Sequence, residues 1–345
     1  TWEAGHLEGK ITDTHIIERG TMDDKGTLVA ALESVEMLLA EGFRPQRTLY
    51  LAFGHDEEVG GARGAKKIAD YLENQGVEAL MTVDEGGFLA DGMVPGLDGT
   101  VAIVNTAEKG YASFRLIVET KGGHSSAPPE ENTIGILAQA IVDLENNQLP
   151  YKMVAPIDAQ LQALGPELPF AQRIAMANPW LFGGMILKGL NAHTTTAPTI
   201  VEGGMKSNVI PTQAEATVNF RILPGETVES VEQHIRNTVH DTIRIEPVGF
   251  LVNPSRASST ESESYTVLQK TIRGLFEDTP VIPGLVGGGT DARYFYDISE
   301  DVYRFYPLRI SPQNMGGFHG IDEKIAKSNY DEMIGFTYHL IRNLQ

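Results

Sequence analysis

Two apolar segments separated by a helix-like segment constrain the fold of this chain more than any other feature. TLYLAFG (48–54) and ALMTVDEGG (79–87) have the character of strands, and GARGAKKIADYLENQG (61–76) between them has helical periodicity and ends at a glycine. Residues 28–42 are predicted to form a further amphipathic helix. Strands that alternate with helices form parallel sheets covered on both faces. We therefore expect an α/β fold with a mostly parallel sheet and helices on both of its faces.

The pattern changes near residue 110. YASFRLIVETKGG (111–123) alternates as a half-exposed antiparallel strand does, and residues 132–146 have the pattern of a helix. Residues 150–200 carry an irregular signal, for which we expect helical turns. A strand, a helix and a strand then follow at residues 214–225, 228–239 and 243–250. This order predicts an α+β unit inserted into the first domain.

The alternation of the first domain resumes after SRASSTESE (255–263). Residues 265–277 are predicted to be helical, and a long helix closes the chain. A chain of 345 residues also favours two domains over a single core. We therefore predict a discontinuous domain, residues 1–108 and 251–345, and an inserted domain, residues 109–250.

The composition narrows the choice of partners and cofactors. The formal net charge of -19 argues against nucleic acid or an anionic membrane surface as partner, and it suits a soluble enzyme or cation binding. The chain has no cysteine, so any metal must be held by His, Asp and Glu. No apolar run approaches the length of a membrane span.

Three acid pairs stand at the end of an apolar segment or at the start of a helix. A pair at a helix start can cap the helix, and a pair after a strand can lie in a solvated turn. Carboxylates gathered at one edge of a sheet repel each other, however, and a cation is the natural compensation. Capping explains one pair well and all three poorly. The pairs are Asp23–Asp24 in GTMDDKG, Glu57–Glu58 in HDEEVGG and Asp84–Glu85 in VDEGG.

Two histidines lie in loops that could approach these acids. His124 lies in the turn GGHSSAPP, and His319 lies in GGFHGIDE before the last helix. A lone loop histidine is often merely solvated, but neutral imidazole is also the commonest nitrogen ligand for zinc.

A third set of residues suits substrate recognition. Arg221 in FRILPG and Asn208 in KSNVIP offer a guanidinium and an amide that can bind a substrate carboxylate, although a sheet-edge salt bridge is the alternative for Arg221. GGGT (287–290) lacks the Gly-Lys-Ser/Thr of a phosphate loop. Its glycines, Gly289 among them, either let the backbone approach a ligand closely or form a flexible turn.

As a set, these motifs resemble the two-zinc peptidases and amidohydrolases that include carboxypeptidase S, aminoacylase-1 and succinyl-diaminopimelate desuccinylase. The closest likeness is to the carboxypeptidase S branch, which also contains a secreted N-fatty-acyl amino acid synthase/hydrolase. The motifs cover nearly the whole chain in the order of the family. They are ERGTMDDKG, AFGHDEEVGG, TVDEGG, KGGHSSAP, KSNVIP, FRILPG, GGGTDAR and FHGIDE.

The resemblance implies a role for each acidic motif. Asp23 would bridge two zinc ions, and the Asp23–Asp24 peptide bond would be cis. Glu57 would be the general base that deprotonates the bridging water. Glu58 would bind one zinc ion. Asp84 would bind the other, with its neighbour Glu85 left open as the alternative ligand.

The resemblance also assigns the remaining motifs. His319 would be the last metal ligand. The inserted domain would be a lid and dimerisation domain, whose His124 reaches the active site of the partner in a homodimer and stabilises the oxyanion. Asn208 and Arg221 would bind substrate, with Arg221 on its terminal carboxylate.

One departure from the family pattern is serious. The family carries a His-x-Asp motif upstream of the segment that matches TWEAGHLEGKI, and its histidine is the remaining zinc ligand. His6 and His15 fall at positions that are not ligands in relatives. We therefore expect an N-terminally truncated family member with one incomplete zinc position, weakened zinc binding and little or no activity.

The sequence thus predicts a zinc-dependent hydrolase that cleaves an amide bond next to a free carboxylate, as a carboxypeptidase does on short peptides. An N-acyl amino acid amidohydrolase is the alternative enzyme, with residues 150–200 as a lining for a lipid acyl group. A non-catalytic homologue that binds peptide or only dimerises is the alternative of a different class. The sequence yields no prediction of where in the cell the protein acts.

Overall fold

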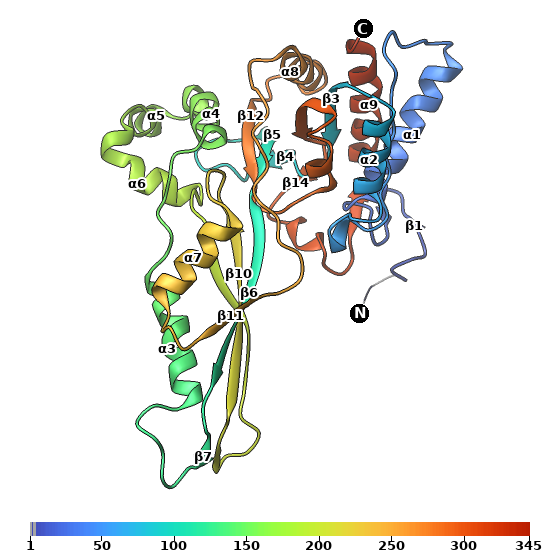
Figure 1. Ribbon diagram of the computed structural model, residues 1–345. Helices are drawn as coiled ribbons and strands as arrows, with labels where there is room; N and C mark the ends of the chain where they lie inside the picture. Colours follow the sequence, from blue (N-terminus) through green and yellow to red (C-terminus); the bar gives the residue numbers. More distant parts are fainter. Residues whose placement is uncertain (1, 3–4) are drawn as a thin grey trace.

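The computed structural model, which describes residues 2 and 5–345, has a broad α/β body from which a long, narrow arm extends (Figure 1). The centre of the body is a six-stranded mixed sheet with the order β14-β4-β5-β13-β3, in which β12 pairs with β5. Its strands are β3 (Ala79–Asp84), β4 (Phe88–Asp91), β5 (Thr100–Glu108), β12 (Val281–Val286), β13 (Ser299–Arg304) and β14 (Arg309–Ile310).

The body sheet is mostly parallel. β12 pairs in parallel with β5, β13 with β3, and β14 with β4, whereas β4 runs antiparallel to β5. β13 and β5 meet only at Arg304 and Asn105. β3, β13, β4 and β14 therefore run in one direction and β5 and β12 in the other. The carboxyl ends of β3 and β13 lie together at one edge, and polar residues gather at such edges.

Helices cover both faces of the body sheet because its strands are apolar on both faces. Ala102 and Val104 of β5 pack with residues of α8 (Glu263–Leu275) and α9 (Lys327–Asn343). Val101 and Ile103, which point the opposite way, pack with Leu164 of α4 (Ala155–Leu164). Helix α1 (Lys25–Ala40) lies along α9, and α2 (Ala65–Asn74) packs against Phe295 and Ile298. The expected α/β architecture is confirmed.

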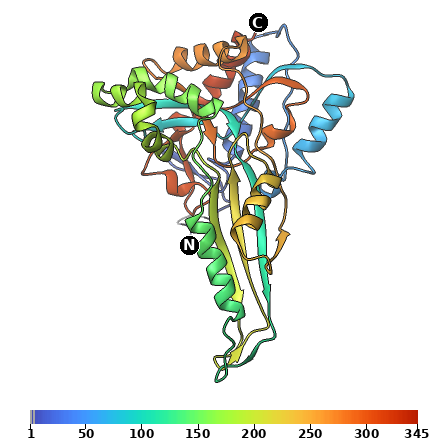
Figure 2. The ribbon, with the colours of Figure 1, turned by 60° about the vertical axis from the view of Figure 1, so that its left-hand side comes forward.

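The arm is an antiparallel sheet with the order β11-β6-β10-β8. Even-numbered residues of β6 and β10 are buried under two helices, which cover one face only (Figure 2). A small β7–β9 ladder closes the far end of the arm. The elements are β6 (Gly110–Glu119), β7 (Gly123–His124), α3 (Thr133–Asn146), β8 (Thr195–Gly203), β9 (Val209–Ile210), β10 (Gln213–Ile222), α7 (Val228–Thr238) and β11 (Arg244–Pro247).

Residues 150–200 are more regular than the expected helical turns. They form α4, η2 (Gly165–Glu167), α5 (Phe170–Ala177), α6 (Pro179–Gly189) and the edge strand β8. Helices α4 and α6 pack on the body rather than on the arm, since Ile157, Leu161 and Ile186 form one cluster with Leu285 of β12.

The predicted strand at residues 48–54 is wrong. This segment has no strand assignment, and no strand of residues 2 and 5–345 pairs with it. Leu49, Leu51 and Phe53 are each about two-fifths exposed. An apolar segment becomes a strand only when a neighbour takes up its hydrogen bonds, and periodicity says nothing of that neighbour.

A smaller three-stranded sheet, β1-β2-β15, brings the start of the chain against the segment before α9. Its strands are β1 (Lys10–Ile11), β2 (His15–Ile17) and β15 (Lys324–Ala326). Within the described residues, no helix is both long enough and apolar enough to cross a membrane.

Candidate active site

Asp23, Glu58 and His319 converge from three distant parts of the chain. Asp23 precedes α1, Glu58 lies in the single turn η1 (Glu57–Val59), and His319 follows η4 (Met315–Gly317). The Nε2 atom of His319 lies 2.6 Å from Asp23 Oδ2 and 3.5 Å from Glu58 Oε1. One ligand atom from each residue lies within 4.8 Å of the others, and no other such group of three is found in the part of the chain that the structure describes. His6 and His15 are not members of this group.

The imidazole of His319 is held between two acids. Its hydrogen bond with Asp23 raises the pKa of His319, and the nearby charge of Glu58 acts in the same direction. The same three side chains could instead surround a cation, because a metal ion would displace the proton that the imidazole now shares with Asp23.

A buried acid that sequence reasoning missed holds the Asp23 loop in place. The side chain of Glu323 is fully buried and accepts hydrogen bonds from the backbone N–H groups of Gly20 (3.0 Å), Met22 (2.7 Å) and Asp23 (3.2 Å). It also pairs with Arg19 at 2.8 Å. Glu323 stands four residues after His319, so one stretch of chain supplies a site residue and fixes the position of another. The Asp23–Asp24 peptide bond is cis, as the resemblance implies.

Glu57 has the properties of a proton acceptor near neutral pH. Burial, together with the negative charges of Asp291 and Glu58, raises the pKa of Glu57 to about 7. The guanidinium of Arg293 opposes this shift and lies 3.9 Å from Glu57 Oε1. A carboxyl group with a pKa close to the ambient pH can both take up and release a proton.

The third acid pair stands at the carboxyl end of β3, and its Glu85 lies close enough to Asp23 and Glu57 for their charges to act on it. Burial raises the pKa of Asp84, and one of its oxygens, Oδ2, is buried without a hydrogen-bond partner. Burial also raises the pKa of Glu85 strongly, and the negative charges of Asp24, Asp84, Asp23 and Glu57 raise it further. The pKa of Asp24 is raised in the same way, first by burial. These raised pKa values show that the three acid pairs lie close enough to repel one another.

An ion pair that is completely buried lies beneath Asp84. Glu108 Oε1 accepts from Arg304 Nε at 2.8 Å and from the backbone N and the Oγ1 of Thr290 at 3.1 and 2.6 Å. The positive charge of Arg304 lowers the pKa of Asp84 against the effect of burial. The pair therefore anchors the GGGT turn and supports the end of β3. Sequence reasoning gave neither Glu108 nor Arg304 a role.

Arg293 links the GGGT turn to Glu57, because its guanidinium lies close to both Gly289 and the Glu57 carboxylate. A Cβ at Gly289 would lie 2.8 Å from a guanidinium nitrogen of Arg293, so the glycine gives this side chain room. Asp291 packs against Gly61, whose φ of +67° and lack of a Cβ both suit a glycine. One oxygen of Asp291 is buried without a partner, and burial raises the pKa of Asp291 to about 6.

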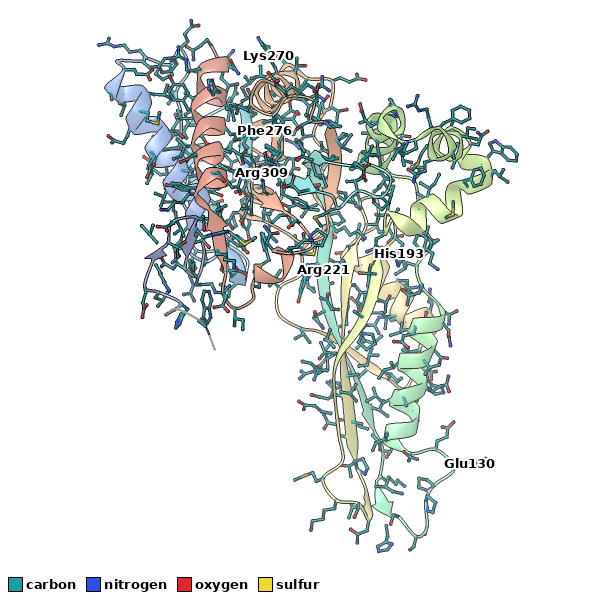
Figure 3. All side chains as sticks on the ribbon, turned by 180° about the vertical axis from the view of Figure 1, so that it is seen from behind. Glu130, His193, Arg221, Lys270, Phe276 and Arg309 are labelled. Carbon is teal, nitrogen blue, oxygen red and sulfur yellow. The ribbon has the colours of Figure 1, made fainter. Side chains whose placement is uncertain are left out.

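The predicted site residues of the arm are split between its two ends. His124 and Asn208 are exposed at the far end, where the backbone N–H of Ser125 donates to the Asn208 carbonyl at 3.2 Å (Figure 1). Arg221 lies at the opposite end of β10, at the junction with the body (Figure 3). A single chain therefore does not bring His124 or Asn208 to the acid pairs.

This chain is similar to known proteins in sequence and in fold. The description "Peptidase family M20/M25/M40" belongs to a family model that matches residues 6–343. "Probable carboxypeptidase S-like 2" of Dictyostelium discoideum is 39% identical, over 100% of this chain and 68% of its own length. "N-fatty-acyl-amino acid synthase/hydrolase PM20D1" of Xenopus tropicalis is also 39% identical, over 99% of this chain and 69% of its own length. The crystal structure of an M20 family metallo-carboxypeptidase, Sso-CP2 from Sulfolobus solfataricus, shares the fold with a TM-score of 0.70 at 19% identity, over 99% of this chain and 80% of its own.

Proposed function

The chain belongs to peptidase family M20/M25/M40, and from this premise we propose that it is a zinc-dependent hydrolase that cleaves an amide bond next to a free carboxylate. The observation that carries the proposal is the convergence of Asp23, Glu58 and His319 beside Glu57, whose pKa of about 7 suits a general base. A short peptide cleaved at its carboxyl terminus is the substrate that fits the names of the carboxypeptidase S-like relatives.

The donor set fits zinc. It offers one imidazole nitrogen and carboxylate oxygens within 4.8 Å of one another, and the chain has no thiolate to compete. The buried, unpartnered Oδ2 of Asp84 and the raised pKa values of Asp24 and Glu85 indicate an excess of negative charge that a cation would offset.

We assign one zinc ion to Asp23, Glu58 and His319, and a second to Asp23 and Asp84, with Glu85 as the alternative ligand. Among residues 2 and 5–345 no histidine completes the second position, so we expect it to be weaker than the first. Zinc bound there would supply a Lewis acid that polarises the scissile carbonyl and lowers the pKa of a water molecule.

The remaining steps belong to this chain's own side chains. The carboxylate of Glu57 takes the proton of the attacking water at its Oε atoms and passes it to the leaving amine nitrogen. Burial raises the pKa of Glu57, and the charges of Asp291 and Arg293 then act on that pKa in opposite directions. Arg221, and Asn208 from a partner subunit, bind the substrate, with the guanidinium on its free carboxylate. Gly289 lets the substrate approach the backbone of the GGGT turn.

We further propose a homodimer. His124 and Asn208 can meet an active site only in a second copy, where His124 would donate to the oxyanion. Edge strand β8 supports this proposal because Ile200 and Val201 are 53% and 62% exposed on it, an unusual position for aliphatic side chains.

An N-acyl amino acid amidohydrolase is the second candidate, and two observations favour it. One relative is named as an N-fatty-acyl-amino acid synthase/hydrolase. In addition, α5 and α6 carry Phe170 and Trp180 with 76% and 82% of their surface exposed, together with Leu181 and Met185. Such side chains would accept an acyl chain. A purely binding role is disfavoured because the chain keeps Glu57, Asp23 and His319.

Metal content and hydrolysis test the proposal together. Because no described histidine completes the second zinc position, we expect about one zinc ion per wild-type chain and at most slow cleavage of dipeptides and N-acyl amino acids, and we expect the same zinc content without cleavage in Glu57→Gln. Cleavage of dipeptides faster than long-chain N-acyl amino acids selects the carboxypeptidase, and the reverse selects the amidohydrolase. A wild-type chain that holds no zinc at micromolar concentrations overturns the proposal.

A further inference from the structure

Arg221 is a guanidinium without an acidic partner on the open face of the arm. It alternates with Phe220 and Ile222, which are buried under α3 and α7, so its side chain points to the face that these helices leave uncovered. Within the part of the chain that the structure describes, no carboxylate lies within 4.0 Å of it. Its N–H donors are therefore available to a ligand.

An aromatic ring holds this guanidinium from one side. Arg221 and Tyr111 are direct cross-strand partners in the β10–β6 ladder, and the Arg221 Cζ atom lies 4.9 Å from the centre of the Tyr111 ring. Direct partners in an antiparallel ladder have side chains in contact on one face, so the register itself fixes this pair. A ring on one face of a guanidinium leaves the N–H groups at its edge unobstructed, and these bind a carboxylate in two places at once.

A second ring continues the stack toward the catalytic turn. The Phe250 ring lies 4.6 Å from that of Tyr111, with 20° between their planes. Phe250 in turn lies against Gly60, where a Cβ would be 3.8 Å from the Phe250 ring. Gly60 directly follows η1, the turn that carries Glu57 and Glu58. The stack thus joins the arm's guanidinium to the turn that carries the general base.

The backbone around the stack is tightly fixed. Tyr111 and Val252 exchange two backbone hydrogen bonds, both of 2.8 Å, where the chain passes between body and arm. A Cβ on Gly110 would lie within 2.5 Å of the Val252 carbonyl oxygen, so only glycine allows the two crossing segments to approach this closely. Tyr111 and Phe250 therefore occupy a junction with little freedom to move.

We propose that Tyr111 and Phe250 are positioning residues that hold the Arg221 guanidinium for the free carboxylate of the substrate and set its distance from the Glu57 turn. The inference rests on the proposed function, because it takes Arg221 as the carboxylate-binding residue. Tyr111 supplies the contact with Arg221, and Phe250 supports Tyr111 by stacking on its ring.

The test compares two ligands that differ only in the carboxylate. The affinities of N-acetyl-L-phenylalanine and N-acetyl-L-phenylalaninamide are measured by calorimetry for the zinc-loaded Glu57→Gln chain, which should not cleave them, alone and combined with Tyr111→Ala, Tyr111→Phe or Phe250→Ala. Tyr71→Ala, at an exposed tyrosine of α2, is the matched control for truncation. The readout is the ratio of acid to amide affinity, which a general loss of stability does not change.

We expect Tyr111→Ala to lower that ratio by about 3- to 30-fold, the range for loss of a cation–aromatic contact. Tyr111→Phe keeps the ring and should keep the ratio, since it loses only a 3.3 Å hydrogen bond with Ser113. Phe250→Ala should lower the ratio by less than Tyr111→Ala does. If Tyr111→Ala does not fold, Phe250→Ala is the variant that tests the inference. An unchanged ratio in both alanine variants overturns the inference while the proposed function stands. A Glu57→Gln chain with Tyr111 and Phe250 intact that does not distinguish acid from amide overturns both the Arg221 assignment and the inference.

Discussion

Glu323 accepts a hydrogen bond from the backbone N–H of Asp23 at 3.2 Å, although 300 residues separate the two. The same carboxylate takes up two further N–H groups of that loop and pairs with Arg19. A fully buried acid with four partners is a structural anchor, and here it determines where the candidate bridging ligand lies.

Substitution of Glu323 should therefore affect both stability and metal binding. Glu323→Ala leaves three backbone donors and a guanidinium without their acceptor, which should lower the free energy of unfolding by about 3–5 kcal/mol. Zinc affinity should fall as well, because Asp23 loses its support. Urea unfolding and zinc titration measure the two effects. Glu73→Ala, at an exposed acid of α2, is the control and should change neither. Unchanged zinc affinity in a destabilised Glu323→Ala would contradict the positioning role.

Glu57→Gln should separate catalysis from metal binding. The substitution keeps the shape of the side chain but removes the proton acceptor, so kcat should fall by about 10²- to 10⁴-fold while zinc content is retained. Glu58→Gln is the matched comparison, because it alters the neighbouring carboxylate that lies 3.5 Å from His319 and should weaken zinc binding. A Glu57→Gln enzyme with wild-type kcat would assign the base to another residue.

Glu57 should also make the stability of the metal-free protein depend on pH. Its pKa is about 7 in the folded state against 4.5 ordinarily, so between these values the folded state binds more protons than the unfolded state. The free energy of unfolding therefore falls as pH rises from about 4.5 to about 7, by an amount on the order of 3 kcal/mol. Glu57→Gln lacks this contribution. Urea unfolding in EDTA gives the free energy of unfolding of the wild type and of Glu57→Gln at pH 5 and at pH 7.5. If the two proteins differ in this free energy by the same amount at both pH values, the prediction is contradicted.

The sequence predicted the features that depend on local patterns. Helical periodicity identified α3 and α9, and the acid pairs at the ends of apolar segments led to Asp23, Glu57 and Asp84. It failed where a residue's role depends on a distant partner. Glu323 resembles any surface acid until Asp23 is seen beside it, and the apolar segment 48–54 resembles a strand although no described strand pairs with it. His124 and Asn208 show a third case, because their predicted roles require a second chain.

His319 should be essential for the stronger zinc position. Its Nε2 atom is the one nitrogen donor of the group, so His319→Asn should lower zinc affinity by more than about 100-fold. Loss of a residue that only supports a metal ligand costs less, about 10- to 100-fold. His339→Asn, at an exposed histidine of α9, is the control and should leave the affinity unchanged. Zinc titration against a chromogenic chelator gives both values. An affinity in His319→Asn within threefold of the wild type would remove His319 from the ligand set.

The buried pair beneath Asp84 gives a prediction that only a double substitution tests. Arg304→Met leaves the carboxylate of Glu108 buried without its cation, which should cost about 3–5 kcal/mol of unfolding free energy. Adding Glu108→Gln to Arg304→Met should restore part of that stability, because the neutral amide oxygen still accepts from Thr290 and neither member of the pair is then charged. Urea unfolding of the wild type, both single variants and the double variant gives the coupling energy. If the double variant is no more stable than Arg304→Met, the cost arises from lost packing around Arg304 and not from the unpaired charge of Glu108.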